Sequence, residues 1–432
     1  MGKYIRREMH DLLTEQLRKG SLGGVILSGV VGAGKTTLVR KVLEDLKTEF
    51  DIFQFSGDDV QFRKNVFENS KYIYQQIQSR TQRPALVFVD EVQKSEHVFD
   101  ALKIAFDEYQ IRFIISGSNP AYLSTVAKNR LQRRANQLIL LPISMKEILA
   151  AEGHFDLKEA AQFEELLFSN LHPKDLKWKR AIRLTANITK IFKSYLSYGG
   201  FPLVLQAVSH EDRMAHLRMI VERGFDLFKN ENEDLAERVR LELSQLHSKE
   251  FAFQNIMSKT RLRKRDMINN GINDLINYGY LCKKKPTLIL NNKSSYLSVF
   301  SYIDPGIVTY LNGSAPDHEQ LGFQLEGYIH SRLDAAVKNS PIKTEYGYYK
   351  KHILESTGNI KYQPGEIDFV LLRAKKIIPI EVKLASEINK IDSMLILNFI
   401  KEHSLEFGII IYGGVPHWDK KHKLLYWPFW MV

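Results

Sequence analysis

The stretch GVVGAGKT at residues 29–36 decides the fold of the N-terminal part of this 432-residue chain. It follows the pattern G-x-x-x-x-G-K-[S/T] and comes after an apolar run, GGVILSG (23–29), that we expect to form a strand. A glycine-rich turn between a strand and a helix lets successive N–H groups face phosphate oxygens, and the helix adds its positive end. The order of strand, motif and helix therefore favours a nucleotide-binding P-loop over a glycine-rich turn without a ligand.

Each position of the motif has an expected part in binding ATP. The Lys35 side chain would reach the β- and γ-phosphates as a catalytic group, and the Thr36 hydroxyl would ligate Mg²⁺. The other expected nucleotide-binding residues supply backbone N–H groups or the permissive angles of glycine. They are Gly29, Val30, Val31, Gly32, Ala33, Gly34 and Thr37.

A second apolar run, PALVFVDE at 84–91, ends in two acidic residues. Asp90 would bind the nucleotide's metal ion through Thr36 or a water molecule. Glu91 would polarise the attacking water as a general base. Acidic residues after a strand can also cap the next helix, but the P-loop upstream favours the catalytic interpretation.

The segment IRFIISGS (111–118) is a further strand candidate that ends in small hydroxyl residues. Ser116 is the first candidate for a catalytic polar group that senses the γ-phosphate, and Ser118 is the second. Serine at the end of a strand is also ordinary turn chemistry, so both interpretations stay open.

Three arginines follow in the segment NRLQRRANQ (129–137). One of them would act as an arginine finger on the ATP of a neighbouring subunit, which requires a homo-oligomer. A solvated basic face is the alternative. The three residues are Arg130, Arg133 and Arg134.

Composition limits the class of protein and its partners. The 61 Lys and Arg residues against 50 Asp and Glu give a formal net charge of +11, which favours a polyanionic partner such as DNA or serves solubility alone. No apolar stretch is long enough to cross a membrane, so no membrane contact is expected. The single Cys282 excludes an internal disulfide, and we expect a reducing, cytoplasmic location.

The chain changes character three times along its length. Residues 1–150 alternate strand and helix candidates, which indicates an α/β core with a mostly parallel sheet and flanking helices. Residues 151–235 look helical and are expected to form a lid. Residues 236–318 contain a helix followed by the strand candidates TLIL and SYLSVF around the turn NNKS, the outline of a winged helix. Residues 319–432 open with a helix and continue in strands.

A basic cluster marks the expected second helix of the winged helix. Recognition helices meet DNA through their N-terminal residues, where basic side chains contact phosphates. A winged helix that contacts another protein is the alternative. The expected DNA-binding residues are Arg261, Arg263, Lys264 and Arg265.

The C-terminal part combines carboxylates and a lysine in a pattern typical of metal-dependent nucleases. In IPIEVK (378–383), Glu381 and Lys383 share one face of the expected strand. Asp368, in GEIDF, would join Glu381 in binding Mg²⁺, Glu326 on the preceding helix would add a third carboxylate, and Lys383 would support the attacking water. An amphipathic strand with its charges in a cleft or in solvent is the alternative.

Several of these motifs together resemble a known family. GVVGAGKT, VFVDEVQK, IISGSN, NRLQRRANQLILLPISMKEIL and YLSYGGFP are similar to AAA+-type ATPases of bacteria and archaea that carry a C-terminal domain of unknown function. YIDPGIVTYLNG, GFQLEGYIHSRL, GEIDF and IPIEVK extend the resemblance over nearly the whole chain.

The resemblance implies three further expectations. Arg134 holds the place of the family's arginine before LxPxS, which favours it over its neighbours as the finger. The GGFP segment would place Gly200 and Pro202 against the nucleotide, unless it only ends a helix. Residues 319–432 would adopt a restriction-endonuclease-like α/β fold.

The expected function is ATP binding and hydrolysis, with ATP and Mg²⁺ as cofactors, coupled to DNA binding and metal-dependent DNA cleavage. A signalling or scaffold ATPase with an inactive nuclease-like domain is one alternative. A nucleotide-controlled transcription regulator is another.

Overall fold

The computed structural model describes most of the chain, and every structural statement below concerns these residues. They are 4–19, 23–131, 134–177, 185–228, 233–260, 265–287, 297–354, 360–374 and 376–432. Four basic residues expected at functional sites, and the expected turn NNKS (291–294), lie outside them. These residues are Arg133, Arg261, Arg263 and Lys264.

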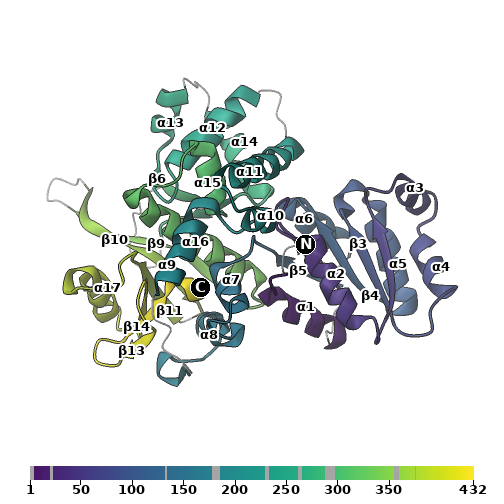
Figure 1. Ribbon diagram of the computed structural model, residues 1–432, viewed down its shortest axis with the longest axis horizontal. Coiled ribbons are helices and arrows are strands. Elements are labelled where there is room, and N and C mark those ends of the chain that lie inside the picture. The colour runs from purple at the N-terminus through teal and green to yellow at the C-terminus, as the bar shows by residue number, and fades with distance from the viewer. Residues whose placement is uncertain are drawn as a thin grey trace.

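The N-terminal region is a five-stranded parallel sheet with helices on both faces (Figure 1). The strands run in the order β2-β3-β4-β1-β5, and every neighbouring pair is parallel. The strands are β1 (Gly24–Ser28), β2 (Asp51–Ser56), β3 (Ala85–Asp90), β4 (Arg112–Gly117) and β5 (Ala135–Ile139). The helices are α1 (Glu8–Lys19), α2 (Lys35–Leu46), α3 (Val60–Glu68), α4 (Tyr72–Gln78), α5 (His97–Tyr109) and α6 (Pro120–Arg130), with a 3₁₀ turn at Val92–Lys94.

Alternating side chains of the central strands explain why this sheet has helices on both faces. In β1, Val25 and Leu27 pack with α1 and α2, whereas Ile26 belongs to the core formed with α3 to α6. The expected parallel sheet is therefore confirmed. The fifth strand, β5, was not expected, because the polar Asn136 and Gln137 interrupt its apolar residues.

The middle region is helical and includes a small antiparallel sheet in the order β6-β8-β7. Its helices are α7 (Met145–Ala151), α8 (Leu157–Phe168), α9 (Ala186–Tyr198), α10 (Pro202–Gln206), α11 (His210–Phe225), α12 (Glu233–Gln245), α13 (Phe253–Thr260), α14 (Arg265–Asn277) and α15 (Pro305–Asn312), with 3₁₀ turns at Pro173–Asp175 and Asp226–Phe228. Its strands are β6 (Glu250–Phe251), β7 (Leu281–Lys284) and β8 (Ser298–Tyr302).

The strand that pairs with β8 is β7, whose residues include two lysines of the basic run 283–285. Leu281 to Lys284 lie opposite Tyr302 to Val299. Residues 288–290 of the expected strand TLIL (287–290) lie outside the described residues, so that strand stays a prediction.

The C-terminal region is a six-stranded mixed sheet in the order β13-β14-β12-β11-β10-β9. Its strands are β9 (Glu345–Leu354), β10 (Ile360–Arg373), β11 (Lys376–Val382), β12 (Gly408–Tyr412), β13 (His417–Asp419) and β14 (Leu424–Pro428). Its helices are α16 (His318–Asn339) and α17 (Lys390–Glu402), with a final 3₁₀ turn at Phe429–Met431. The expected opening helix and the strands around Asp368 and Glu381 are present.

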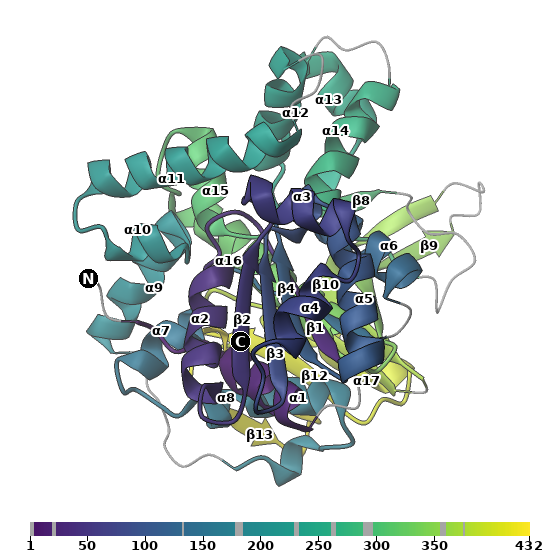
Figure 2. The same cartoon turned by 90° about the vertical axis from the view of Figure 1, so that its right-hand side faces the viewer.

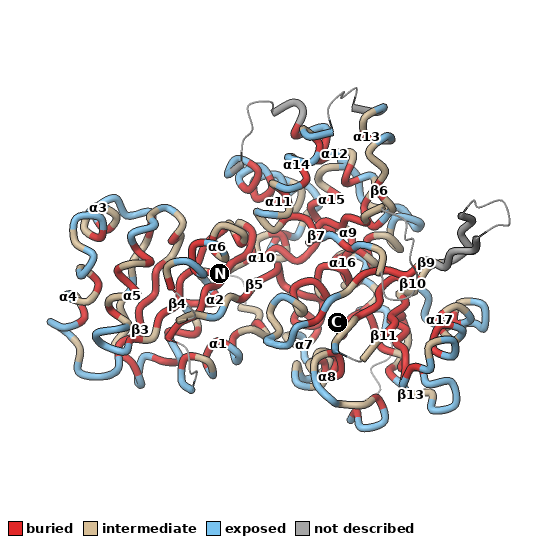
Figure 3. The backbone as a smooth tube through the Cα atoms, turned by 180° about the vertical axis from the view of Figure 1, so that it is seen from behind, coloured by how far each residue is buried: buried red, intermediate tan, exposed pale blue. Residues whose placement is uncertain are grey.

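Helices of the middle region join the two large sheets. The ring of Phe163 in α8 lies 5.3 Å from that of Trp427, and Phe192 in α9 stacks on Phe429 at 4.2 Å. Figure 2 views the molecule from the side of the N-terminal sheet, with the C-terminal sheet behind it. Figure 3, coloured by the burial of each residue, shows buried residues along both sheets and the helices between them. No helix in the described residues is long and apolar enough to span a membrane.

Candidate functional site

The P-loop lies between β1 and α2 and takes a conformation that requires glycine. Gly32 and Gly34 have φ angles of 80° and 94°, in the left-handed region. The Lys35 side chain folds back over the loop, where its Nζ donates to the carbonyl oxygens of Gly29 at 2.8 Å and Val30 at 3.1 Å. A phosphate group bound in the loop would replace these carbonyl oxygens as partners of the ammonium group.

The surroundings of the Lys35 ammonium group favour the binding of an anion. Its side chain is buried, which lowers its pKa, while the nearby carboxylates of Glu91 and Asp90 act in the opposite direction. A buried ammonium group whose two carbonyl partners are neutral gains from an anionic ligand, because opposite charges attract more strongly where water is excluded. The local electrostatics therefore suit phosphate.

Asp90 at the end of β3 connects the P-loop to β4. The Thr36 hydroxyl donates to Asp90 Oδ2 at 2.7 Å, and the Ser116 hydroxyl donates to Asp90 Oδ1. Hydroxyl and carboxylate oxygens are the ligands that Mg²⁺ prefers, so Thr36 and Asp90 fit this ion. Ser116 contacts the carboxylate directly, which suits a residue that positions Asp90.

Glu91 takes an unusual backbone conformation next to the P-loop. Its φ of 50° is left-handed, and its side chain makes no capping hydrogen bond to the 3₁₀ turn that follows. The capping alternative is therefore wrong. Gln93 Nε2 donates to Glu91 Oε2 and also to Ser118 Oγ, the latter at 3.1 Å. Gln93 thus orients the expected base, a contact with no signal in the sequence.

A second residue that the sequence did not reveal is Arg7, just before α1. Its guanidinium donates to the carbonyl oxygens of Ala33 at 3.0 Å and Leu141 at 2.7 Å, and to Glu147 Oε1 at 3.1 Å. Arg7 is buried and fixes the P-loop against the chain that follows β5. No local pattern marks a single arginine at this distance from the motif.

The GGFP segment lies beside the P-loop. A side-chain carbon at Gly34 would come within 3.4 Å of Pro202 Cγ, so Pro202 lies at the loop. Gly200 instead makes backbone hydrogen bonds to other parts of the chain. Its N–H donates to Asp304 Oδ2 at 2.8 Å, and its carbonyl oxygen accepts from Ile143 N at 2.9 Å. The structure therefore brings Pro202 to the nucleotide site and gives Gly200 other partners.

Arg134 lies at the opposite end of the sheet from the P-loop. Its carbonyl oxygen accepts from Gly24 N at the start of β1, whereas the P-loop follows the end of β1. Its guanidinium pairs with both oxygens of Asp107, at 2.8 and 3.1 Å. Arg130 pairs with Glu96 and Asp100. Neither arginine can reach the ATP site of its own chain.

The expected C-terminal residues converge, but a lysine from the middle region joins them. Lys284 of β7 donates to Glu326 Oε1 at 2.6 Å and to the backbone oxygen of Asp368 at 3.0 Å. Lys383 Nζ contacts Glu381 Oε1 at 2.5 Å, and Val382 N donates to Asp368 Oδ2 at 2.7 Å. We call Glu326, Asp368, Glu381, Lys383 and Lys284 the C-terminal centre.

Burial sets the protonation of this centre. Burial raises the pKa of Asp368 well above its usual value, and the neighbouring carboxylates Glu381 and Glu326 raise it further. Burial also raises the pKa of Glu381, against the effect of Lys383. Glu381 is only 5% exposed, so the alternative of an amphipathic strand with its glutamate in solvent is wrong.

Lys284 is the unexpected member of this centre. Its side chain is fully buried, and its Nζ lies 4.3 Å from the ring centroid of Phe369. Burial lowers its pKa, but Glu326 and Asp368 outweigh that effect and raise it. Across the described part of the chain, no three His, Cys, Asp or Glu side chains are grouped as a metal site. The ammonium groups of Lys284 and Lys383 offset part of the negative charge of these carboxylates.

Of the expected DNA-binding residues, Arg265 is the one that the structure describes. It is exposed at the first position of α14, and its guanidinium lies 5.9 Å from the ring of Phe253. In the neighbouring basic run, Lys283 and Lys285 are exposed, whereas Lys284 turns inward.

Two stretches of the chain match known domain families. Residues 23–149 match the AAA domain, and residues 321–430 match a domain of unknown function, DUF4143. No curated protein matches the sequence. The AAA-domain match and the geometry at Lys35, Thr36 and Asp90 together support a nucleotide-binding P-loop ATPase.

Similar solved structures include the following three chains. The Hsp104–ADP complex of S. cerevisiae is 16% identical over 64% of this chain and 40% of that chain, with a TM-score of 0.31. A RuvB mutant from Thermotoga maritima is 16% identical over 66% and 91%, with a TM-score of 0.30. The FIGL-1 AAA domain with ADP is 16% identical over 50% and 68%, with a TM-score of 0.28. This chain spans 40% of the Hsp104 chain, and TM-scores this low carry no argument of their own.

Proposed function

We propose that this protein binds ATP with Mg²⁺ and hydrolyses it at the P-loop. The observation that carries this proposal is the contact of Thr36 with Asp90, at 2.7 Å, beside the buried ammonium group of Lys35. Thr36 and Asp90 would hold the ion, which neutralises phosphate charge when bound. Lys35 would exchange its loop carbonyl partners for phosphate oxygens.

Glu91 is the proposed base. Gln93 orients its carboxylate, and Ser118 orients Gln93, so the three side chains would place a water molecule for attack on the γ-phosphate. Ser116 is proposed to position Asp90 instead of sensing the phosphate directly. Pro202 would close the loop from the side of α10, so that nucleotide binding affects the helices beyond it.

Replacing Glu91 by Gln tests this assignment. The variant keeps the shape of the side chain and its hydrogen bond to Gln93, but it cannot accept a proton. We expect ATP binding to persist while hydrolysis falls by roughly 10²–10⁴-fold. Glu96→Gln, on a nearby exposed residue, is the matched control and should hydrolyse ATP at the wild-type rate. Unchanged hydrolysis in Glu91→Gln would remove Glu91 from the mechanism.

We further propose, as a second function, that the middle and C-terminal regions handle DNA. Helices α12 to α14 with the sheet β6-β8-β7 are interpreted as a winged helix, and Arg265 with the basic residues before it would contact phosphates. The C-terminal region is interpreted as a restriction-endonuclease-like domain. The convergence of Asp368, Glu381 and Lys383 favours this interpretation, as metal-dependent phosphodiester cleavage uses these groups.

In this proposal, the position of the Lys284 side chain distinguishes an active from an inactive form of that domain. While its ammonium group contacts Glu326 and Asp368, a divalent cation held by Asp368 and Glu381 would meet like charge nearby. Cleavage would therefore require Lys284 to withdraw. A signalling or scaffold ATPase, or a nucleotide-controlled regulator, would keep Lys284 in place.

A cleavage assay separates these functions. Wild-type protein and Asp368→Ala are incubated with linear and branched DNA in Mg²⁺ or Mn²⁺, with and without ATP. Cleavage that is lost in Asp368→Ala supports the nuclease. Salt-sensitive DNA binding without cleavage supports the regulator. Neither binding nor cleavage supports the scaffold, and the ATPase proposal stands in all three cases.

A further inference from the structure

A single segment of the chain, residues 279–287, runs from the P-loop to the C-terminal region and includes β7. It begins against the P-loop. Val30 belongs to the same buried core as Tyr280, and a side-chain carbon at Gly279 would lie 3.9 Å from Val30 Cγ1. Burial raises the pKa of the Tyr280 hydroxyl, and the backbone of Val31 acts on that pKa in the opposite direction. The segment therefore packs on the loop in which the phosphates of a nucleotide would bind.

The other end of this segment lies on β9, the edge strand of the C-terminal sheet. Tyr348 N donates to Lys285 O at 3.0 Å, and Thr287 N donates to Tyr348 O at 2.8 Å. A side-chain carbon at Gly347 would come within 2.2 Å of Lys285 O, so glycine at this position allows the two backbones to approach each other. The segment therefore pairs with the C-terminal sheet as well as with β8.

Between the two ends, alternate side chains of β7 contact α16. Cys282 Sγ donates to Asp334 Oδ2 at 3.4 Å, and Lys284 Nζ donates to Glu326 Oε1 at 2.6 Å. Successive side chains of a strand point to opposite faces, so Cys282 and Lys284 share the face toward this helix. Tyr280 precedes Lys284 by four residues, which is roughly 13 Å of extended chain. A short strand thus connects the P-loop with the C-terminal centre.

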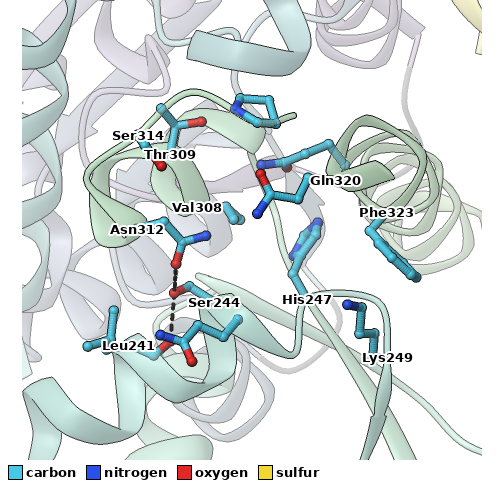
Figure 4. Close-up of a pocket in the computed structure, with 13 residues that line it drawn as sticks. Leu241, Ser244, His247, Lys249, Val308, Thr309, Asn312, Ser314, Gln320 and Phe323 are labelled. Atoms are coloured by element: carbon cyan, nitrogen blue, oxygen red, sulfur yellow. Dashed lines mark hydrogen bonds between the residues drawn. The ribbon is translucent and has the colours of Figure 1, made fainter. Parts of the chain in front are cut away.

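The elements around β7 are joined to one another by hydrogen bonds. Tyr302 of β8 donates through its N–H to His247 Nδ1 at 3.2 Å and through its hydroxyl to Arg240 O, in α12, at 2.8 Å. Figure 4 shows His247 and the hydrogen bond of 2.7 Å from Ser244 in α12 to Asn312 in α15. Because close-packed interiors transmit strain, a displacement at one end of β7 is passed along the strand.

We propose that Tyr280 positions the P-loop and that Lys284 anchors β7, so that the C-terminal centre controls the affinity for nucleotide. This inference rests on the proposed ATP site. A bound phosphate would replace the carbonyl oxygens of Gly29 and Val30 as partners of Lys35, so binding acts on the part of the loop that contacts the segment. Coupling between two sites is reciprocal. Bound nucleotide therefore favours Lys284 in the centre, and a cation that displaces Lys284 weakens the binding of nucleotide.

Calorimetric titration of the full-length protein with ADP and Mg²⁺ tests this coupling. Lys284→Met removes the anchor, and we expect the affinity for ADP to fall by roughly fivefold or more. The neighbouring exposed Lys283→Met is the matched control and should bind ADP as wild type does. Circular dichroism checks that each variant is folded. Glu326→Gln weakens the contact of Lys284 without removing a side chain, and it should reduce the affinity in the same direction.

The outcomes separate this inference from the proposed function. If wild-type protein does not bind ADP, the ATP site itself is wrong. If wild type binds ADP and the affinity is unchanged in Lys284→Met, or in Glu326→Gln where Lys284→Met does not fold, the coupling is overturned.

A double variant distinguishes transmission along β7 from a general loss of stability. Tyr280→Phe removes the hydroxyl near Val31 and keeps the ring. It should raise KM for ATP and leave kcat unchanged, because a residue that positions the loop contributes to binding and not to the chemical step. In Tyr280→Phe/Lys284→Met the two losses of ADP affinity should not add, since both changes interrupt the same connection. Additive losses would show independent effects and would overturn the proposal.

Discussion

The P-loop site and the C-terminal centre both gather acidic side chains at strands, but different groups contact their carboxylates. At the P-loop site, two neutral hydroxyl groups, from Thr36 and Ser116, contact Asp90. At the C-terminal centre, the ammonium groups of Lys284 and Lys383 contact Glu326 and Glu381. Hydroxyl groups can share a carboxylate with an incoming cation. Ammonium groups already compensate the charge, so a cation must displace them.

The largest expected effect comes from removing a positively charged side chain from the C-terminal centre, which lowers the stability of the folded protein. Lys284→Met leaves Glu326 and Asp368 without their buried counter-charge, and we expect a loss of about 3–5 kcal/mol. Trp418, Trp427 and Trp430 lie in or beside the C-terminal sheet, so urea unfolding followed by tryptophan fluorescence measures it. Mn²⁺ should restore part of this loss by replacing the ammonium group.

Lys283→Met is the matched control, because the neighbouring Lys283 is exposed. A loss in Lys284→Met no larger than in this control would show that Lys284 does not balance the centre.

The next largest effect is expected at the P-loop. Lys35→Met removes the group that would bind the phosphates, and we expect ATP hydrolysis to fall by roughly 10²–10³-fold. Folding should be unaffected or improved, because a buried ammonium group with only carbonyl partners is lost. Steady-state phosphate release measures the rate, with Lys41→Met on the exposed face of α2 as the control. A rate within a few fold of the control would contradict the role of Lys35.

Asp304 lies outside both centres and accepts its hydrogen bonds from backbone N–H groups, so it shows how burial alters the pKa of a carboxylate that does not contact a lysine in this way. Asp304 is buried, accepts from the N–H groups of Gly200 and Gly306, and has its pKa raised by burial to about 6. The folded state therefore binds a proton more tightly than the unfolded state, and stability falls as the pH rises from about 4 to about 6. Asp304→Asn should remove this fall, a difference of ~1–3 kcal/mol at pH 7. Urea midpoints over that pH range test it, and an equally steep fall in the variant would exclude Asp304.

The smallest effect is expected at a hydroxyl partner of Asp90. Ser116→Ala removes one neutral donor, and we expect a loss of ~1 kcal/mol in stability, well below that for Lys284→Met. Ser118→Ala is the variant for comparison, and its rate of ATP hydrolysis is measured beside that of Ser116→Ala. It loses a contact with Gln93 instead of one with Asp90. Equal losses in Ser116→Ala and Lys284→Met would erase the difference between the two centres.

Local patterns predicted the parts of the fold and the site that are close together in the sequence. Four of the five parallel strands have apolar runs, and the P-loop and Asp90 follow such runs. In β5, the polar Asn136 and Gln137 interrupt the apolar residues, so its signal is weaker. Lys284 stands in a run of three lysines that reads as exposed, and only pairing of β7 with β8 turns its side chain toward Glu326 and Asp368.

Long-range contacts explain the other residues that the sequence did not reveal. Arg7 meets the carbonyl oxygens of Ala33 and Leu141, and Asp304 meets the N–H of Gly200 about a hundred residues away. Most of these partners are backbone atoms, and Glu147, an acidic partner of Arg7, lies 140 residues further along the chain, so no local pattern joins them. Arg134 matched a motif, yet the strand β1 separates it from the P-loop of its own chain by roughly 15 Å.

Mn²⁺ binding, followed by electron paramagnetic resonance, tests the contrast between the two centres most directly. The wild-type protein should bind Mn²⁺ only when ATP is present. Asp90→Asn should lose this binding and Glu381→Gln should keep it, because Thr36 and Asp90 fit the ion whereas lysines occupy the C-terminal centre. Mn²⁺ binding that persists in Asp90→Asn and disappears in Glu381→Gln would contradict the account.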